Sequence, residues 1–118
     1  MSASLPIRLS CDTVRTVAFG GISPVYAGVG TAFTKPVRIF YIQNLTDTIL
    51  MFSYDGINDH FPLFETTFKL LDVTANHSVS QGYFMAQGQR LYVRDMTAQG
   101  FNAPTTGSVW LTVYVGGM

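Results

Sequence analysis

The sequence predicts an all-β fold, an antiparallel β-sandwich of jelly-roll type, from three observations. Short runs rich in β-branched and aromatic residues alternate with turn-forming residues along the chain. No stretch of a dozen residues keeps a helical stripe of apolar residues free of Gly, Pro and β-branched clusters, so we expect at most a single helical turn. The 118 residues suit one domain. Without helices to connect parallel strands, the strands are expected to pair antiparallel and to pack in layers.

Residues 1–36 are expected to contribute one or two strands and a Gly-rich arm or loop. The strand candidates are residues 6–10 and 13–19. The segment that follows is rich in glycine and yet apolar, which is atypical of a disordered linker. We expect residues 20–34 to be either an arm that orders against a partner subunit or a tight turn within the domain's own sheet. If they form an arm, deletion of residues 1–34 leaves the fold intact but weakens assembly.

Residues 37–118 are expected to form the core of the sandwich. Residues 37–44 and 49–54 are two β-rich runs around a polar turn, which predicts a hairpin. Both runs are apolar on both faces, as expected of central strands that a second sheet covers on one side and a neighbour or a loop on the other. Further strands are predicted at residues 66–73 and 79–86.

The last two predicted strands, residues 89–95 and 108–115, alternate between apolar and other residues, as half-buried strands do. Each strand is therefore expected to turn one face to the core. In the first strand Leu91 and Val93 face the core, opposite Arg90, Tyr92 and Arg94; in the second Val109, Leu111, Val113 and Val115 face the core, opposite Trp110, Thr112 and Tyr114.

The composition predicts a protein that stays in permanent contact with others. Hydrophobic residues make up 47% of the chain and charged residues only 12%, about half of the usual charged share. Seven basic residues balance seven acidic ones, whereas a soluble monomer normally carries a mixed charged surface and a net charge. Obligate interfaces replace surface charge with apolar and aromatic area. We therefore expect a homo-oligomer, joined by sheet edges and by the Gly-rich segment.

Other classes of function find little support in the sequence. The few cations are scattered from Arg8 to Arg94, which argues against nucleic acid as a ligand. The single Cys11 offers no disulfide framework and is expected to be packed inertly. No signal peptide or apolar membrane span is recognised, so no membrane contact is expected. Too few paired titratable residues are present to supply an acid, a base and a nucleophile, so we expect neither an enzyme nor a cofactor.

The densest polar cluster, residues 55–60, is the candidate for an ion site. Clustered oxygen ligands can hold calcium, and Asp with His can hold a transition metal. The spacing lacks the regular alternation and terminal Glu of an EF-hand, so our first expectation is a polar turn in which Asp and Asn side chains bond nearby backbone. The weak metal candidates are Asp55, Asn58, Asp59 and His60.

The expected interface residues come from the Gly-rich segment and from the faces of the last two strands that carry aromatic side chains. Tyr, Trp and Arg are frequent anchors of protein–protein contacts. The face of Arg90, Tyr92 and Arg94 could instead stack on a base or a sugar. The candidates are Ile22, Val25, Tyr26, Val29, Arg90, Tyr92, Arg94, Trp110 and Tyr114.

Five stretches, YIQNLTD (41–47), MFSYDGINDH (51–60), FKLLDVTAN (68–76), AQGQRLYVR (86–94) and GSVWLTV (107–113), carry a resemblance. They resemble small structural proteins of tailed bacteriophages, and the resemblance covers about residues 37–118. It implies a virion component, made in the host cytoplasm, that serves at the head–tail neck as a collar or connector subunit or on the capsid as a decoration protein. Its implied partners are other copies of itself and the portal, connector or major capsid protein. The competing interpretation is a carbohydrate- or ligand-binding β-sandwich that uses residues 55–62 with exposed Tyr and Trp residues.

Overall fold

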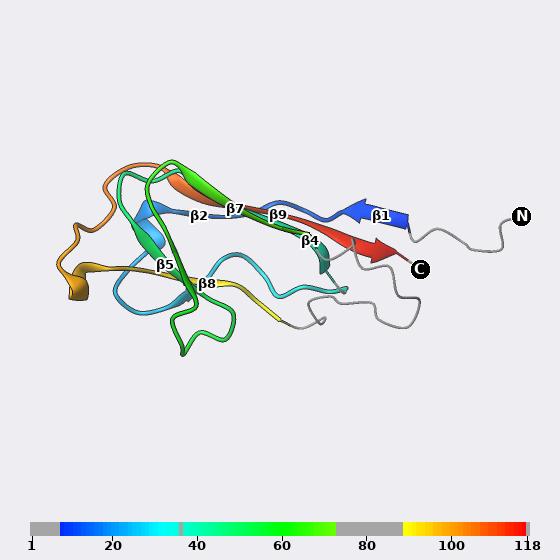
Figure 1. The fold of residues 1–118 in the computed structure, drawn as a ribbon, viewed down its shortest axis with the longest axis horizontal. Coiled ribbons are helices and arrows are strands. Elements are labelled where there is room, and N and C mark those ends of the chain that lie inside the picture. The colour runs from blue at the N-terminus through cyan, green and yellow to red at the C-terminus, as the bar shows by residue number, and fades with distance from the viewer. Residues whose placement is uncertain (1–7, 36, 73–88, 118) are drawn as a thin grey trace, which may run out of the picture.

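The computed structural model describes residues 8–35, 37–72 and 89–117. These residues form two antiparallel sheets packed against each other (Figure 1). The predicted antiparallel β-sandwich is therefore confirmed. Two single 3-10 turns, η1 (Phe19–Gly21) and η2 (Thr97–Gln99), are the helical elements of the described residues.

The first sheet has five strands and forms the upper layer in Figure 1. The last strand of the chain runs through it and pairs with two strands at one edge and with a central strand on its other side. The strand order is β1-β9-β4-β7, with β2 also pairing with β9. The strands are β1 (Arg8–Cys11), β2 (Arg15–Ala18), β4 (Val37–Asn44), β7 (Thr67–Asp72) and β9 (Ser108–Gly117).

The second sheet has four shorter strands and forms the other layer. Its order is β3-β8-β5-β6, and every neighbouring pair is antiparallel. The strands are β3 (Ala27–Gly28), β5 (Leu50–Ser53), β6 (Phe61–Leu63) and β8 (Tyr92–Asp95).

The core lies between the two sheets and consists of alternate residues of their strands. Phe40 and Ile42 enter it from the first sheet, and Leu50 and Phe52 enter it from the second. The inward residues predicted for the last two strands are all buried, so both predicted alternations are confirmed. These residues are Leu91, Val93, Val109, Leu111, Val113 and Val115.

The predicted hairpin of residues 37–54 is wrong, because β4 and β5 belong to different sheets. The turn between them crosses from one layer to the other, and the buried side chain of Asn44 holds this corner. Its Nδ2 donates to the carbonyl oxygens of Thr48 and Leu63, each at 2.9 Å, and its Oδ1 accepts from the backbone N–H of Thr46 at 3.0 Å. The buried amide thus satisfies backbone groups that the strand ladders do not reach.

The N-terminal residues are part of the sandwich and not an addition to it. β1 and β2 pair with β9, and β3 pairs with β8, so this segment supplies strands to both sheets. Ile22, Val29 and Phe33 are buried in the core. The backbone N–H of Val29 also donates to the carbonyl oxygen of Leu91 at 2.7 Å. The Gly-rich segment therefore packs on the domain's own sheet, and the core includes residues from before residue 37.

The remaining predicted strands lie close to observed ones. Residues 6–10 and 13–19 correspond to β1 and β2, residues 66–73 to β7, and residues 89–95 to the shorter β8. β3 and β6 are not predicted, because runs of two and three residues show no periodicity. The strand predicted at residues 79–86 lies outside the described residues.

Candidate functional site

The side of the first sheet that faces away from the core carries a continuous set of apolar and uncharged polar side chains. Alternate residues of β2, β9, β4 and β7 point to this side, and the strand register aligns them across the sheet. We call nine of these residues the outer face. Thr16, Trp110, Gln43 and Phe68 form one row, Thr112, Tyr41 and Leu70 form the next, and Tyr114 and Ile39 form the third.

Four large side chains of the outer face are exposed. The exposed fraction is 59% for Phe68, 56% for Leu70, 39% for Trp110 and 36% for Tyr114. The ring of Tyr41 lies among them, with its centroid 5.4 Å from that of Phe68. None of these nine residues carries a charge, and the charged Asp72, at the end of β7, is the register partner of Ile39 in the third row. Contiguous exposed apolar surface of this kind marks an interaction site in soluble proteins.

The sequence identifies only part of this face. Trp110 and Tyr114 are predicted interface residues, and the structure places both on the outer face. Phe68 and Leu70 are missed, because simple alternation in β7 would turn the charged Lys69 to solvent. Lys69 instead reaches inward, with its Nζ atom 5.3 Å from the ring centroid of Phe61, and its two neighbours point outward. The long stem of a lysine allows this at the edge of a sheet.

Arg94 is buried in an ion pair and is not open to a partner. Its Nη2 and Nε atoms donate to the Asp59 carboxylate at 2.8 Å and 3.3 Å, and the Tyr26 hydroxyl donates to the same carboxylate. The hydrogen bond from Arg94 is the main cause that lowers the pKa of Asp59. Burial, followed by the contact with Asp59, raises the pKa of Tyr26 to about 12. This internal cluster removes Arg94 from the predicted interface.

Arg90 and Tyr92 lie on the outer side of the second sheet, where the domain's own loops cover them in part. The Nε of Arg90 donates to the carbonyl oxygen of Gly30 at 2.6 Å, and its guanidinium carbon lies 5.8 Å from the ring centroid of Tyr92. Gly56 has a φ of +77°, and a Cβ atom there would lie 3.3 Å from the Tyr92 ring. The glycine therefore lies against this ring, and a base or sugar would have to displace the loop to stack there.

The polar cluster of residues 55–60 is a turn held by its own side chains. The Oδ1 atom of Asp55 accepts from the Ser53 hydroxyl and from the backbone N–H groups of Ile57 and Asn58, all at 2.8 Å. The backbone hydrogen bonds are the main cause that lowers the pKa of Asp55. His60 accepts at Nδ1 from the backbone N–H of Tyr54 at 2.9 Å. Over the described ranges, no three His, Cys, Asp or Glu side chains are grouped as ligands of a metal would be.

The four interface candidates of the Gly-rich segment separate into core and surface residues. Ile22 and Val29 are 7% and 0% exposed, so the structure moves both from the predicted interface to the domain's own core. The physical reason is that their apolar side chains pack in the hydrophobic core together with those of the two sheets. Tyr26 is partly buried against Asp59. Val25, at 73% exposed, is on the surface.

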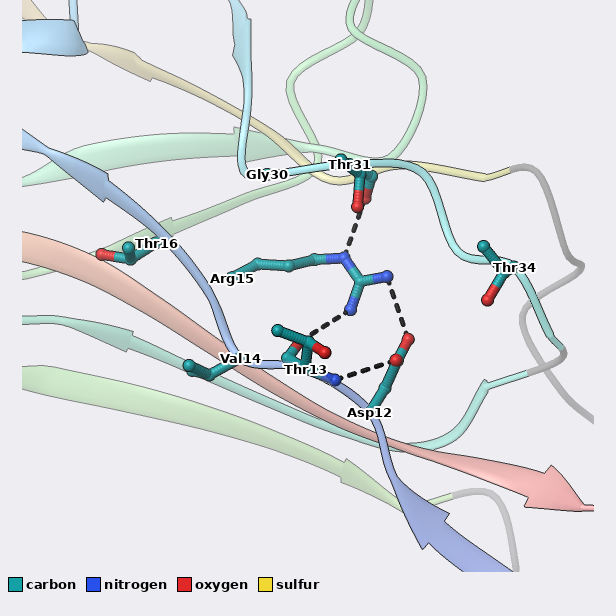
Figure 2. A pocket seen from close by; sticks show the side chains of 8 residues that line it. All are labelled: Asp12, Thr13, Val14, Arg15, Thr16, Gly30, Thr31 and Thr34. Atoms are coloured by element: carbon teal, nitrogen blue, oxygen red, sulfur yellow. Dashed lines mark hydrogen bonds and ion pairs between the residues drawn. The ribbon is translucent and has the colours of Figure 1, made fainter.

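A cavity of about 400 Å³ lies between β2 and the Gly-rich segment (Figure 2). The side chain of Arg15 crosses it. Its Nε donates to the carbonyl oxygen of Thr31 at 2.8 Å, its Nη1 to that of Thr13 at 3.2 Å, and its Nη2 to the Asp12 carboxylate at 3.0 Å. Its guanidinium carbon also lies 5.0 Å from the ring centroid of Phe33. Arg15 therefore links Asp12 and Thr13, which precede β2, to Thr31 of the Gly-rich segment.

Cys11 is exposed, which corrects the expectation of a packed thiol. It lies at the end of β1, opposite Tyr114 of β9. Its register partner Tyr114 belongs to the outer face, so the Cys11 side chain points to the same side of the sheet, away from the core. Its Sγ donates to the carbonyl oxygen of Asp12 at 3.4 Å.

No protein-family model, curated protein or solved structure matches this chain. Among the helices of the described residues, none has the length and apolar character that crossing a membrane requires. The outer face is therefore the feature on which a function can be argued.

Proposed function

We propose that this protein is a structural component of a tailed-bacteriophage virion, either a collar or connector subunit at the head–tail neck or a capsid decoration subunit. It assembles through its outer face. The virion setting rests on the resemblance of residues 37–118 to structural proteins of tailed bacteriophages, and the observation that carries the assembly is the exposure of Phe68, Leu70 and Trp110 on the outer face. Burial of apolar surface is favourable by about 25 cal/mol per Å². A subunit in permanent contact with a neighbour keeps such a face covered.

The strand order supports the same class of protein. The orders β2-β9-β4-β7 and β3-β8-β5-β6 mean that the chain passes repeatedly from one sheet to the other. We interpret this order as a jelly roll, an architecture found in viral capsid domains and in lectins. Because one fold serves several functions, the choice between these two depends on the site.

The sites of the two functions differ in this chain. A carbohydrate- or ligand-binding module would combine residues 55–62 with exposed Tyr and Trp side chains. Gly56 lies against Tyr92 on the second sheet, whereas Trp110 and Tyr114 lie on the first. The loop and the exposed Trp110 and Tyr114 therefore belong to opposite layers, and this separation favours the assembly function.

Incorporation into particles tests the proposal. Virus particles are purified from lysed cells that carry the gene, and mass spectrometry measures the copy number of the protein relative to the major capsid protein. We expect a fixed copy number for the wild-type chain and for Ile57→Glu, a control at an 80% exposed residue on the polar turn. We expect Trp110→Glu to be lost from particles. A wild-type protein that is abundant in the lysate and absent from particles would contradict the proposal.

A further inference from the structure

Four of the described edge strands, β2, β3, β6 and β7, are poor templates for an added strand. In the described residues the first sheet ends at β7 on one side and at β1 and β2, which both pair with β9, on the other. The second sheet ends at β6 and at β3. Lys69 of β7 and Arg15 of β2 point inward, and Pro62 of β6 has no N–H to donate. β3 has two residues. Inward charges, proline and short strands are the means by which native sheets avoid edge-to-edge pairing.

The exposed side chains of the outer face supply a large part of the area that a dimer needs. If a fully exposed aromatic side chain presents about 200 Å², the exposed fractions of Phe68, Leu70, Trp110 and Tyr114 amount to about 350 Å². Two such faces would bury about 700 Å² of the roughly 1,000 Å² that a specific interface requires. Partly exposed residues between them, such as Tyr41, add to this area.

The chemistry of the outer face fits a copy of itself. Aromatic rings are enriched and charges depleted at the centres of protein interfaces, and this face has rings, aliphatic groups, hydroxyls and an amide. It carries no charge that would select an oppositely charged partner. The whole chain has a formal net charge of zero, so two copies meet without net repulsion.

We infer that the outer face binds the outer face of a second copy of this chain, in a two-fold symmetric dimer that packs two five-stranded sheets against each other. The inference rests on the proposed function, because it names the partner of the surface proposed there. Packed sheets lie about 10 Å apart, with strand directions within about 30° of each other. A two-fold axis brings the same residues of both copies together. We place Thr112, which lies between Trp110 and Tyr114 on β9 in the middle row of the outer face, near this axis.

The oligomeric state of the full chain is the first test. Size-exclusion chromatography with light scattering and sedimentation equilibrium are run over about a hundredfold range of concentration. We expect a wild-type dimer, a dimer for the control Ile57→Glu, and dissociation constants raised at least about tenfold for Phe68→Glu and for Leu70→Glu. Both substituted side chains are more than half exposed, and circular dichroism verifies each fold. A monomeric wild type, or a dimer that both face variants retain, overturns the inference.

Cross-linking is the second test. Thr112→Cys is introduced together with Cys11→Ser, and the protein is oxidised by air. A two-fold dimer brings the two introduced thiols together, so a disulfide-linked dimer should form on a non-reducing gel. Val25→Cys in the same background is the control, since Val25 is exposed away from the outer face. Cross-linking through the control position but not through position 112 overturns the inference.

The particle experiment separates failure of this inference from failure of the proposed function. A monomeric chain that enters particles and is lost from them in Trp110→Glu overturns the two-fold dimer while supporting the virion role. A dimer that dissociates in Phe68→Glu but never enters particles supports the dimer and overturns the virion role.

Discussion

The ring of Tyr41 on β4 packs against the ring of Phe68 on β7, with centroids 5.4 Å apart and planes inclined by 55°, although the Phe68 side chain is 59% exposed. In the Leu70→Glu background, which we expect to keep the chain monomeric, Phe68→Ala should cost about 0.5–1.5 kcal/mol, the value of one aromatic pair. Phe52→Ala, at a fully buried position, should cost about 3–5 kcal/mol. Urea unfolding measures both, and equal losses would contradict a surface role for Phe68.

The buried amide of Asn44 should be essential for the corner between the sheets. Asn44→Ala leaves the carbonyl oxygens of Thr48 and Leu63 without this donor. Leaving a buried polar group unpaired costs about 1–3 kcal/mol, and more than one is affected here. We expect a loss of at least about 2 kcal/mol in the free energy of unfolding. The exposed Asn102→Ala is the control, and a similar loss there would show that the corner is not special.

Gly107 should tolerate a side chain far less than Gly100 does. Both have positive φ, 86° and 93°, so an alanine at either position is strained by its backbone. At Gly107 a Cβ atom would also lie 2.0 Å from the carbonyl oxygen of Leu45, whereas nothing lies within 4 Å at Gly100. Gly107→Ala should therefore lower the melting temperature by several degrees more than Gly100→Ala, as differential scanning fluorimetry would show. Equal shifts would mean that the contact with Leu45 can relax without cost.

The turn over the second sheet should make stability sensitive to acid. Backbone hydrogen bonds lower the pKa of Asp55, and Arg94 lowers that of Asp59. A carboxyl with a lowered pKa stabilises the fold fully above its unfolded pKa of about 3.9. This contribution is lost as the pH falls from there through the folded pKa. The melting temperature should drop below about pH 4, and less steeply in Asp55→Asn than in the wild type. Parallel melting curves across this range would contradict a role for Asp55.

Deletion of residues 1–34 should now prevent folding, in contrast to the expectation from the sequence. The deletion removes β1, β2 and β3 together with the buried side chains of Ile22, Val29 and Phe33. Loss of one large buried side chain costs about 2–5 kcal/mol, so the loss of three, together with three strands, is comparable to the whole stability of a typical domain. The shortened chain should lack the dispersed NMR signals of a folded sheet. A cooperative thermal transition in this variant would restore the arm hypothesis.

The fold could be predicted to the extent that each strand has distinct faces. In β9, Val109 and Leu111 pack inward while Trp110 points out, so alternation alone gives its orientation. β4 and β5 are apolar on both faces, and a short polar turn between them suits both a hairpin and a crossing between sheets. The deciding contact joins Asn44 to Leu63, 19 residues away. The sequence around Asn44 does not indicate that Leu63 is its hydrogen-bond partner.

Some residues of the candidate site could be predicted from the sequence and others could not. The exposure of Trp110 and Tyr114 follows from the alternation of β9. The outward orientation of Phe68 and Leu70 depends instead on the inward position of Lys69, whose side chain contacts Phe61 on a strand of the other sheet. The Gly-rich segment shows a second limit. An apolar loop has the same composition whether it fills its own core or that of a partner, so burial of Val29 could not be assigned from sequence.

The position of β9 determines when the first sheet can form. Its residues pair with β1, β2 and β4. In the described sheet, the N-terminal strands β1 and β2 are therefore joined to the other strands only through residues 108–117. Pairing over such sequence separations slows folding. During synthesis, the edge of β4 that pairs with β9 has no partner until these residues have been made. The growing chain therefore passes through a stage in which one edge of its central strand is unpaired and open to aggregation or to chaperones.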